Sequence, residues 1–313
     1  MRTVYLGTSE FAAGVLRALA GSGHRPSLVV TRPDRPRGRG RRLTAPPVAE
    51  AARELEIDLL QPEQVNDASV RSRIAARTPE VVCVCAFGAL IKEPLLSDFE
   101  LLNVHPSLLP RWRGAAPIER SIMAGDERTG VSIMRLTAGL DSGPVCAQVG
   151  VPIQPEDTYG TLAARLELQG GNLLVQALDE RPACAAQDET GATYAEKLTA
   201  EDRLLDPTRT AAELARRVRA LAPHIGAAIV LADGTRLGVW AARVANAEPD
   251  VGAESDVEAE SDVEAESVIP GQVSMAGPVP RWRCVDGALE LITVQPPGKR
   301  PMPGSDYLRG RRP

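Results

Sequence analysis

The order of apolar and polar segments predicts an α/β protein with a Rossmann-like parallel sheet, followed by a smaller β-barrel. Over the first half of the chain, short apolar runs alternate with amphipathic segments, which is typical of parallel strands joined by right-handed crossovers. After residue 204 the pattern changes to short strands with turn signals at Asp233-Gly234 and Asp286-Gly287. The 313 residues are enough for two such domains.

The first domain is expected over residues 1–184. Its strands are predicted at residues 4–7, 28–31, 58–60 and 81–87, and its helices at 11–19, 49–55 and 70–76. Glu10 lies near the start of the first helix, where a negative charge interacts favourably with the helix dipole. Ligands of an open α/β sheet bind beyond the carboxyl ends of its strands, so residues at those ends are the first functional candidates.

The second domain is expected as an OB-like β-barrel over residues 204–313, after a linker at 185–203. Thr210 and Glu213 form a capping-box pattern that predicts the start of a helix. Residues 248–267 contain a near-exact acidic repeat of six residues with few large apolar side chains, which predicts a disordered insertion. We expect this insertion to have no task; the alternative is competition with the basic segment described below.

The composition excludes several classes of protein. The chain is 43% hydrophobic and 25% charged, as in ordinary soluble proteins, and no apolar run approaches the roughly 20 residues that span a bilayer. Its first residues read as a strand and not as a signal peptide, so we expect a cytoplasmic protein. The five cysteines include no C-x-x-C pair and no His at ligand spacing, so no metal is expected. Cys83 and Cys85 are expected as small buried hydrophobic residues.

The most informative motif is Asn103-x-His105 at the end of an apolar run, together with Asp141 between two glycines. Side chains two residues apart on a strand point to the same face, so the amide and the imidazole should lie together. Both can donate to the oxyanion of an acyl transfer, and a carboxylate can stabilise and orient the imidazolium. Taken singly, each residue also has a structural explanation, as a strand-end or turn hydrogen bond.

Residues 103–118, 129–132 and 139–143 resemble the folate-dependent formyltransferases, most closely the branch that acts on tRNA, and the likeness covers most of the chain. The resemblance implies transfer of a formyl group from 10-formyltetrahydrofolate to the free amino group of the methionyl moiety of initiator tRNA. It implies that Asn103, His105 and Asp141 are catalytic. The residues implied or proposed to bind the folate cosubstrate are Ser107, Leu108, Leu109, Pro110, Phe87, Gly88 and Leu90.

The charge distribution points to the acceptor. The formal net charge is −5, but residues 32–42 carry six arginines against one Asp. The Gly and Pro residues among them predict an exposed, mobile cationic loop that can bind phosphate, although ordinary solvated charge is the alternative. In the tRNA-formylating relatives a corresponding basic insertion contacts the acceptor stem, with Arg39 at the position of their key arginine. The tRNA-binding candidates are Arg35, Arg37, Arg39, Arg41, Arg42, Lys299 and Arg300.

Two other functions remain open from the residues. The same trio could act on a small amine, such as an amino-sugar nucleotide or glycinamide ribonucleotide, but the arginine-rich segment disfavours that acceptor. The chain could instead be an RNA-binding module without catalysis, but the intact trio argues against this. We therefore expect initiator methionyl-tRNA and folate as partners, no membrane, and a monomer.

Overall fold

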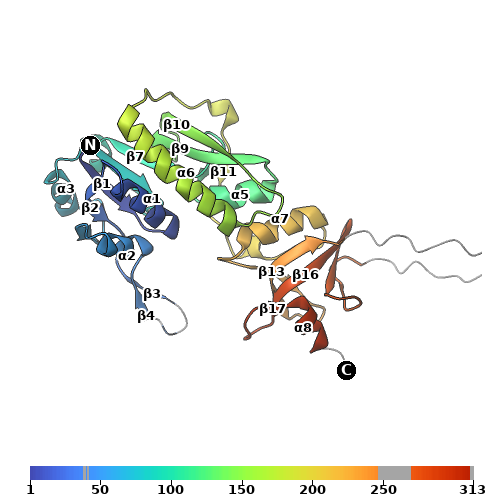
Figure 1. The fold of residues 1–313 in the computed structure, drawn as a ribbon. Helices are drawn as coiled ribbons and strands as arrows, with labels where there is room; N and C mark the ends of the chain where they lie inside the picture. Colours follow the sequence, from blue (N-terminus) through green and yellow to red (C-terminus); the bar gives the residue numbers. More distant parts are fainter. Residues whose placement is uncertain (38–39, 41, 246–268, 311–313) are drawn as a thin grey trace, which may run out of the picture. The chain divides into compact units, whose positions relative to one another are not determined.

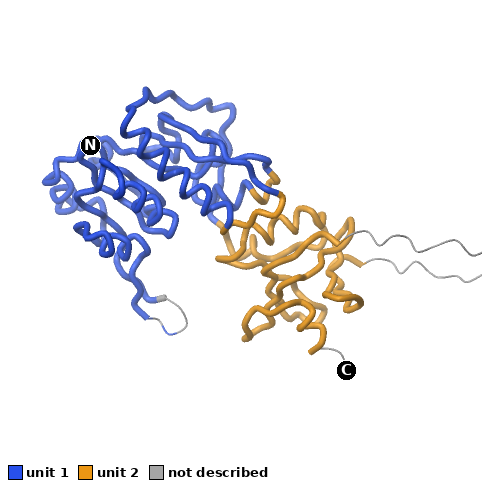
Figure 2. Tube along the Cα trace, in the orientation of Figure 1, with its two compact units in different colours: residues 1–121, 126–154, 161–197 blue, residues 122–125, 155–160, 198–313 orange. Residues whose placement is uncertain are grey.

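The computed structural model describes residues 1–37, 40, 42–245 and 269–310 (Figure 1). It divides into two compact units, which Figure 2 distinguishes by colour. Unit 1 comprises residues 1–121, 126–154 and 161–197, and unit 2 comprises residues 122–125, 155–160 and 198–313. The acidic repeat predicted at residues 248–267 lies outside the described residues.

The sheet of unit 1 contains seven strands within the described chain, in the order β10, β9, β7, β6, β1, β2, β5. They are β1 (Thr3–Gly7), β2 (Pro26–Val30), β5 (Leu59–Leu60), β6 (Val81–Cys85), β7 (Leu101–His105), β9 (Arg128–Arg135) and β10 (Val145–Pro152). The five from β5 to β7 are parallel, which confirms the predicted α/β sheet. β9 and β10 extend it in antiparallel pairing, which the sequence pattern did not predict.

The helices that connect or follow these strands in the chain keep to the predicted alternation. They are α1 (Glu10–Ala20), α2 (Pro47–Glu54), α3 (Ala68–Ala75), α4 (Leu95–Asp98), α5 (Pro117–Ala124) and α6 (Tyr159–Glu180). α1 begins where the Ser9 hydroxyl accepts a hydrogen bond from the Ala12 N–H at 3.2 Å, next to Glu10. It buries Val15, Leu16 and Leu19 completely, as the apolar spacing requires.

One predicted strand is shorter than expected. The apolar run from Val81 was predicted to continue as a strand to Phe87, but β6 ends at Cys85. Ala86 has a φ of 40° and Gly88 a φ of 72°, so the backbone turns out of the extended conformation directly after Cys85. This turn carries Phe87 to the carboxyl end of the sheet.

The arginine-rich segment is a hairpin in its described part. β3 (Arg35–Arg37) and β4 (Arg42–Thr44) pair antiparallel, with Arg35 opposite Thr44. The sequence predicted an exposed, mobile loop here; Arg35 and Arg42 are exposed, and the pairing of two short strands was not predicted. The hairpin extends away from the sheet of its own unit, as Figure 1 shows. Arg39 and Arg41 lie outside the described residues.

Unit 2 has an antiparallel sheet with pairing order β12, β13, β16, β15, β14, and β17 pairs with β16. Its elements are α7 (Ala211–Leu221), β12 (Ala227–Val230), β13 (Arg236–Val244), β14 (Val273–Ser274), β15 (Arg281–Cys284), β16 (Gly287–Gln295), β17 (Met302–Pro303) and α8 (Gly304–Arg309). Hairpins occur at both predicted turns. Within the described residues, the predicted OB-like domain is an antiparallel sheet that runs from β12 to β14.

The capping box that opens α7 is confirmed. The Thr210 hydroxyl accepts a hydrogen bond from the Glu213 N–H, and the Glu213 carboxylate accepts one from the Thr210 N–H, each at 3.2 Å. Leu214 and Val218 then repeat at helical spacing into the core, where the fully buried Trp282 also lies. Both the start of this helix and its buried face therefore follow from local sequence patterns.

Cys146 and Cys184 form a disulfide across 38 residues, which their spacing did not predict. They meet because Val145 and Ala185, next to them, form an isolated antiparallel bridge. Cys83 and Cys85 are buried free thiols, as predicted, and burial raises the pKa of each to about 12.

Within the described chain, no helix combines the length and the apolar composition that crossing a membrane requires.

Candidate active site

Asn103 and His105 lie in the carboxyl-terminal half of β7, the strand between β6 and β9 in the sheet. Every residue of β7 is buried, and the exposed fractions of Asn103 and His105 are only 8% and 4%. The two residues are separated by one position and so share a face of the sheet. The strand thus places an amide and an imidazole side by side at its carboxyl end, as the motif predicted.

Hydrogen bonding fixes the ring of His105. Its Nε2 lies 2.9 Å from the carbonyl oxygen of Trp112, and since a carbonyl can only accept, Nε2 carries a proton. The other nitrogen, Nδ1, lies 3.6 Å from the Oδ2 atom of Asp141. This distance is too long for a hydrogen bond but places the carboxylate where it stabilises positive charge on the ring. Nδ1 is therefore the ring nitrogen available on the Asp141 side.

Asp141 is held in a strained backbone conformation. Its φ is 44°, in the left-handed region that non-glycine residues rarely adopt. The Gly114 N–H donates to Asp141 Oδ2 at 2.9 Å, and Gln187 Nε2 donates to the carbonyl oxygens of Asp141 and Gly143 at 2.8 and 2.7 Å. Both the carboxylate and the turn that carries it are therefore positioned by hydrogen bonds from distant parts of the chain.

Arg113 holds Gln187 in place. Only 2% of the Arg113 side chain is exposed, and its Nε and Nη2 donate to Gln187 Oε1 at 3.0 and 2.8 Å. Nη1 and Nη2 also donate to the Glu189 carboxylate at 2.9 and 2.8 Å. These hydrogen bonds raise the pKa of Arg113 above its usual range and lower that of Glu189.

The hydrogen bonds that join Arg113, Gln187 and Glu189 were not predicted from the sequence. Gln187 and Glu189 lie in the segment predicted as a linker, 74 and 76 residues after Arg113. No local periodicity marks them. The one signal available in the sequence was Arg113 itself. In the structure, Arg113 and Gly114 form the short strand β8 (Arg113–Gly114), in which Gly114 has a φ of 117°. This strand pairs with β11 (Tyr194–Ala195). This pairing brings the segment that was predicted as a linker, residues 185–203, next to Arg113 and Gly114.

A cavity of about 630 Å³ opens in front of the trio. Asn103, His105 and Asp141 all line it, together with residues 86–91 and 136–140. Leu90 and Leu140 are 68% and 62% exposed at the cavity, which is unusual for two large apolar side chains close to polar groups. The cavity thus combines an apolar rim with three convergent polar groups, which is typical of a small-molecule site.

The predicted folate residues divide into two groups. Phe87, Gly88 and Leu90 line the cavity, whereas Ser107, Leu108, Leu109 and Pro110 are not among its lining residues. The Ser107 hydroxyl instead donates to the Arg111 carbonyl oxygen at 2.6 Å, and the Leu109 N–H donates to Ser132 Oγ at 3.1 Å. In this structure residues 107–110 shape the loop that delivers the Trp112 carbonyl to His105.

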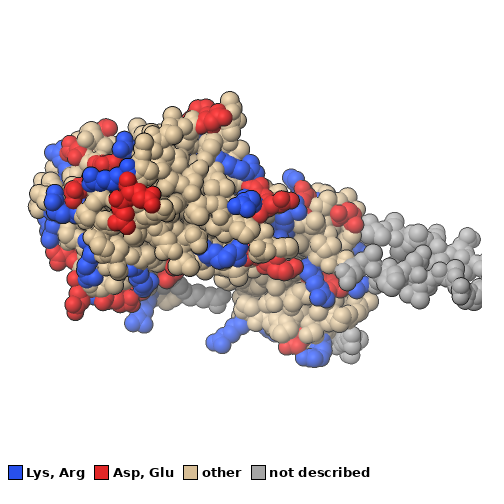
Figure 3. Space-filling model, turned by 45° about the horizontal axis from the view of Figure 1, so that its top comes forward, with Lys and Arg blue, Asp and Glu red and all other residues tan. Residues whose placement is uncertain are grey.

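The predicted tRNA contacts are on the surface where they are described. Arg35 is exposed and pairs with Glu63 at 2.5 Å, and Arg42 is exposed in β4. Arg37 lies in β3, and Arg39 and Arg41 are not described. In unit 2, Lys299 and Arg300 are exposed. On the face drawn in Figure 3, Lys and Arg residues are interspersed with Asp and Glu residues.

Among the residues that the structure describes, no three His, Cys, Asp or Glu side chains are grouped so that they could hold a metal ion.

Comparison with known proteins matches both units. The family described as formyl transferase matches residues 1–178, and its C-terminal domain family matches residues 197–312. The methionyl-tRNA formyltransferase of Halorhodospira halophila is 42% identical, with 99% of this chain and 96% of that protein covered. The one of Methylococcus capsulatus is 40% identical, with 98% and 96% covered.

Among solved structures, HypX from Aquifex aeolicus in complex with tetrahydrofolic acid superposes with a TM-score of 0.61. It is 15% identical, and the alignment covers 98% of this chain and 47% of that one. At this identity the likeness shows the fold alone.

Proposed function

The chain belongs to the formyl transferase family, and from this premise we propose that it formylates the free amino group of the methionyl moiety of initiator tRNA, with 10-formyltetrahydrofolate as the donor. It is a one-carbon group transferase of translation initiation. The likeness to methionyl-tRNA formyltransferases over nearly the whole length, including unit 2, carries this conclusion. Charged tRNA is a cytoplasmic substrate, which supports a cytoplasmic location.

Asn103, His105 and Asp141 fit the chemistry of this transfer. The amine nitrogen forms a bond to the formyl carbon and loses a proton, while the bond from that carbon to the folate nitrogen breaks and the folate nitrogen gains a proton. Negative charge develops on the formyl oxygen before this bond breaks. Asn103 and His105 both line the cavity. We assign the Asn103 amide and Nδ1 of the protonated His105 ring as donors for that oxygen, since Nε2 is already hydrogen-bonded to the Trp112 carbonyl oxygen. Asp141 stabilises the imidazolium and accepts, through a water, the proton that the amine loses.

The cavity suits a flat heterocycle with an apolar body. Phe87 and Leu90 supply apolar surface, and Leu140 faces the same space from the turn before Asp141. The glycine at 88 has a φ of 72° and leaves the backbone open at this position, since a Cβ built there meets nothing within 4 Å. We assign the pterin end of the folate to this slot. Residues 107–110 then support the catalytic loop instead of contacting the cosubstrate.

The basic candidates serve the acceptor. Arg35, Arg37 and Arg42 lie on two short paired strands, and Arg39 and Arg41 fall between these strands in the sequence. Lys299 and Arg300 add two exposed cations on unit 2. Guanidinium groups bind phosphate in a bidentate manner, so a hairpin of arginines is suited to the backbone of an RNA stem.

One assay tests the function. The protein is mixed with 10-formyltetrahydrofolate and with charged initiator tRNA, charged elongator tRNA or an amino-sugar nucleotide, and the formylated product is identified by mass. We expect formylation of methionyl initiator tRNA and at least a strong preference for it. Formylation of the amino sugar alone would establish the small-acceptor alternative in its place.

A further inference from the structure

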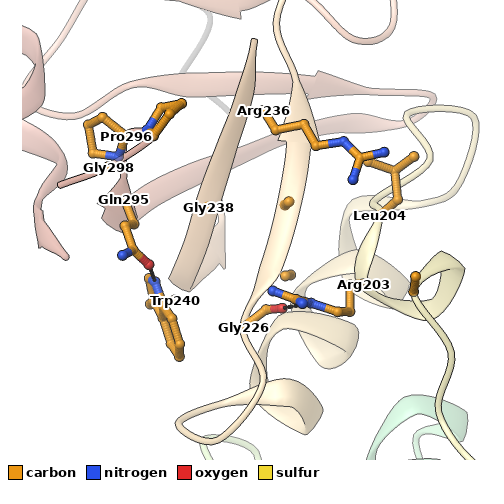
Figure 4. Close-up of a pocket in the computed structure, with 13 residues that line it drawn as sticks. Arg203, Leu204, Gly226, Arg236, Gly238, Trp240, Gln295, Pro296 and Gly298 are labelled. Atoms are coloured by element: carbon orange, nitrogen blue, oxygen red, sulfur yellow. Dashed lines mark hydrogen bonds between the residues drawn. The ribbon is translucent and has the colours of Figure 1, made fainter. Parts of the chain in front are cut away.

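Unit 2 contains a cavity of about 260 Å³ that the formylation chemistry does not use. It is lined by residues from the segment before α7, from strands β12 and β13, and from the turn after β16, as Figure 4 shows. Two arginines, Arg203 and Arg236, lie on one side, and Trp240 and Pro296 lie on the other (Figure 4). No Asp or Glu is among its described lining residues.

Glycine creates the hollow. Arg236, Gly238 and Trp240 alternate along β13, so the glycine lies between a cationic and an aromatic side chain. A Cβ at Gly238 would lie 3.1 Å from Gln295 Cβ and would take up part of the space between Arg236 and Trp240. Gly226, with a φ of 76°, allows the indole to approach the backbone, because a Cβ there would be 3.0 Å from the Trp240 ring.

The wall opposite the arginines is fixed by hydrogen bonds. Trp240 Nε1 donates to Gln295 Oε1 at 2.8 Å, and Gln295 Nε2 donates to the Lys299 carbonyl oxygen at 2.8 Å. The first bond holds the indole, and the second holds the turn that contains Pro296. The aromatic and proline surfaces are therefore ordered before any ligand arrives, which lowers the entropic cost of binding.

The arginine side is positively charged and not neutralised. Arg203 Nε donates to the Gly226 carbonyl oxygen at 3.1 Å, which anchors its guanidinium at the cavity and leaves its other nitrogens free for a ligand. Neither Arg203 nor Arg236 forms an ion pair with a carboxylate of the described residues. Two exposed, unpaired guanidinium groups beside a neutral hollow form a recognition element for phosphate.

The geometry points to a binding site for one nucleoside monophosphate unit, with the base against Trp240 and Pro296 and the phosphate between Arg203 and Arg236. An indole favours a flat π system, and the guanidiniums favour a dianion or a phosphodiester. The volume lies below the roughly 300–1,000 Å³ of sites for larger ligands, so it suits a single nucleotide. We assign this nucleotide to an unpaired position of the tRNA. The choice of tRNA as its source rests on the proposed function, whereas the site itself does not.

Binding of four probes to the full chain tests the proposal by calorimetry: AMP, adenosine, inorganic phosphate and a six-residue oligoadenylate. We expect AMP to bind more tightly than adenosine or phosphate alone. Replacing both Arg203→Gln and Arg236→Gln should weaken AMP binding by about tenfold or more. The control, Arg73→Gln with Arg283→Gln, removes the same charge from exposed positions outside the cavity and should leave binding unchanged.

A second variant separates base from phosphate. Trp240→Leu should weaken AMP binding but not phosphate binding, because it removes only the aromatic wall. Saturable binding of oligoadenylate as well as AMP identifies RNA as the source, whereas binding of AMP alone identifies a free nucleotide. Equal AMP binding by the wild type and the double arginine variant overturns the site. Formylation of charged tRNA by the same proteins is measured in parallel, so a failure of this site is distinguishable from a failure of the proposed function.

Discussion

His105 Nδ1 lies 3.6 Å from Asp141 Oδ2, while Nε2 of the same ring is bonded to the Trp112 carbonyl oxygen at 2.9 Å. The ring therefore cannot rotate to offer Nε2 to a substrate without breaking an internal hydrogen bond. The ring nitrogen left without such a bond is Nδ1, which lies next to the carboxylate. The donor role that we propose for His105 therefore falls to this one atom, with the ring protonated.

Replacing His105 with alanine should reduce turnover by about 10²- to 10⁴-fold, because it removes a donor to the developing oxyanion. Affinity for tRNA should change little, since His105 is only 4% exposed and is not one of the proposed tRNA-binding residues. Single-turnover kinetics and a filter-binding titration measure the two effects separately. Turnover equal to that of the wild type would remove His105 from the mechanism.

Replacing Asp141 with asparagine should lower kcat by about 10²-fold or more while the fold is kept. An asparagine oxygen can still accept the Gly114 N–H, but it carries no charge to stabilise the ring of His105. The pH dependence of kcat is the decisive readout. A profile that keeps both its height and its shape would contradict the assigned role of the carboxylate.

Gln187 is a positioning residue for the Asp141 turn. Gln187→Ala leaves the carbonyl oxygens of Asp141 and Gly143 without their donor, and Arg113 without one acceptor, so the free energy of unfolding should fall by about 1–3 kcal/mol. We also expect kcat to fall with little change in KM for tRNA, because the trio is displaced and the tRNA surface is not.

The matched control for that variant is Gln176→Ala. Gln176 is an exposed glutamine of α6 whose Nε2 contacts Glu180 at 3.0 Å. It should change neither kcat nor the denaturation midpoint. If Gln187→Ala lowers stability alone and leaves kcat and its pH profile as in the wild type, the hydrogen bonds of Gln187 are structural and not part of the positioning of Asp141.

The arginine hairpin should set part of the salt dependence of tRNA binding. Replacing Arg35 and Arg42 with glutamine should make the slope of log Kd against log salt less steep by about 0.7–0.9 for each phosphate contact that is lost. The pair Arg73→Gln and Arg283→Gln removes equal charge elsewhere and is the control. Binding is measured over salt concentrations from roughly 50 to 300 mM. An unchanged slope in the hairpin variant would assign its arginines to ordinary solvated charge.

Four of the five cysteines should divide into two classes under native alkylation. Cys146 and Cys184 should be unreactive until reduced, because they are joined, and their reduction should cost about 2–4 kcal/mol of stability. Cys83 and Cys85 should stay unmodified at pH 8, since burial raises the pKa of each to about 12 and leaves almost no thiolate below that pH. Mass spectrometry after iodoacetamide treatment counts the modified sites. Rapid labelling of Cys146 without reductant would exclude the disulfide.

The sequence by itself determined the local features of this protein. A spacing of two on an apolar strand placed Asn103 and His105 on one face, because side chains alternate along any strand. The Thr210 capping box and the two Asp-Gly turns were equally local, since each depends on hydrogen bonds or dihedral angles within a few residues. The motif around Asp141 was recognised from its resemblance to a family.

Only the tertiary structure decided how those parts are held together. It paired β8 with β11, and so brought Gln187 and Glu189 to Arg113 across more than 70 residues. It also bonded Nε2 of His105 to Trp112 and turned residues 107–110 away from the cavity. Periodicity reports which face of an element is buried, but contacts between distant segments depend on strand order and loop paths, and no local pattern in the chain encodes these.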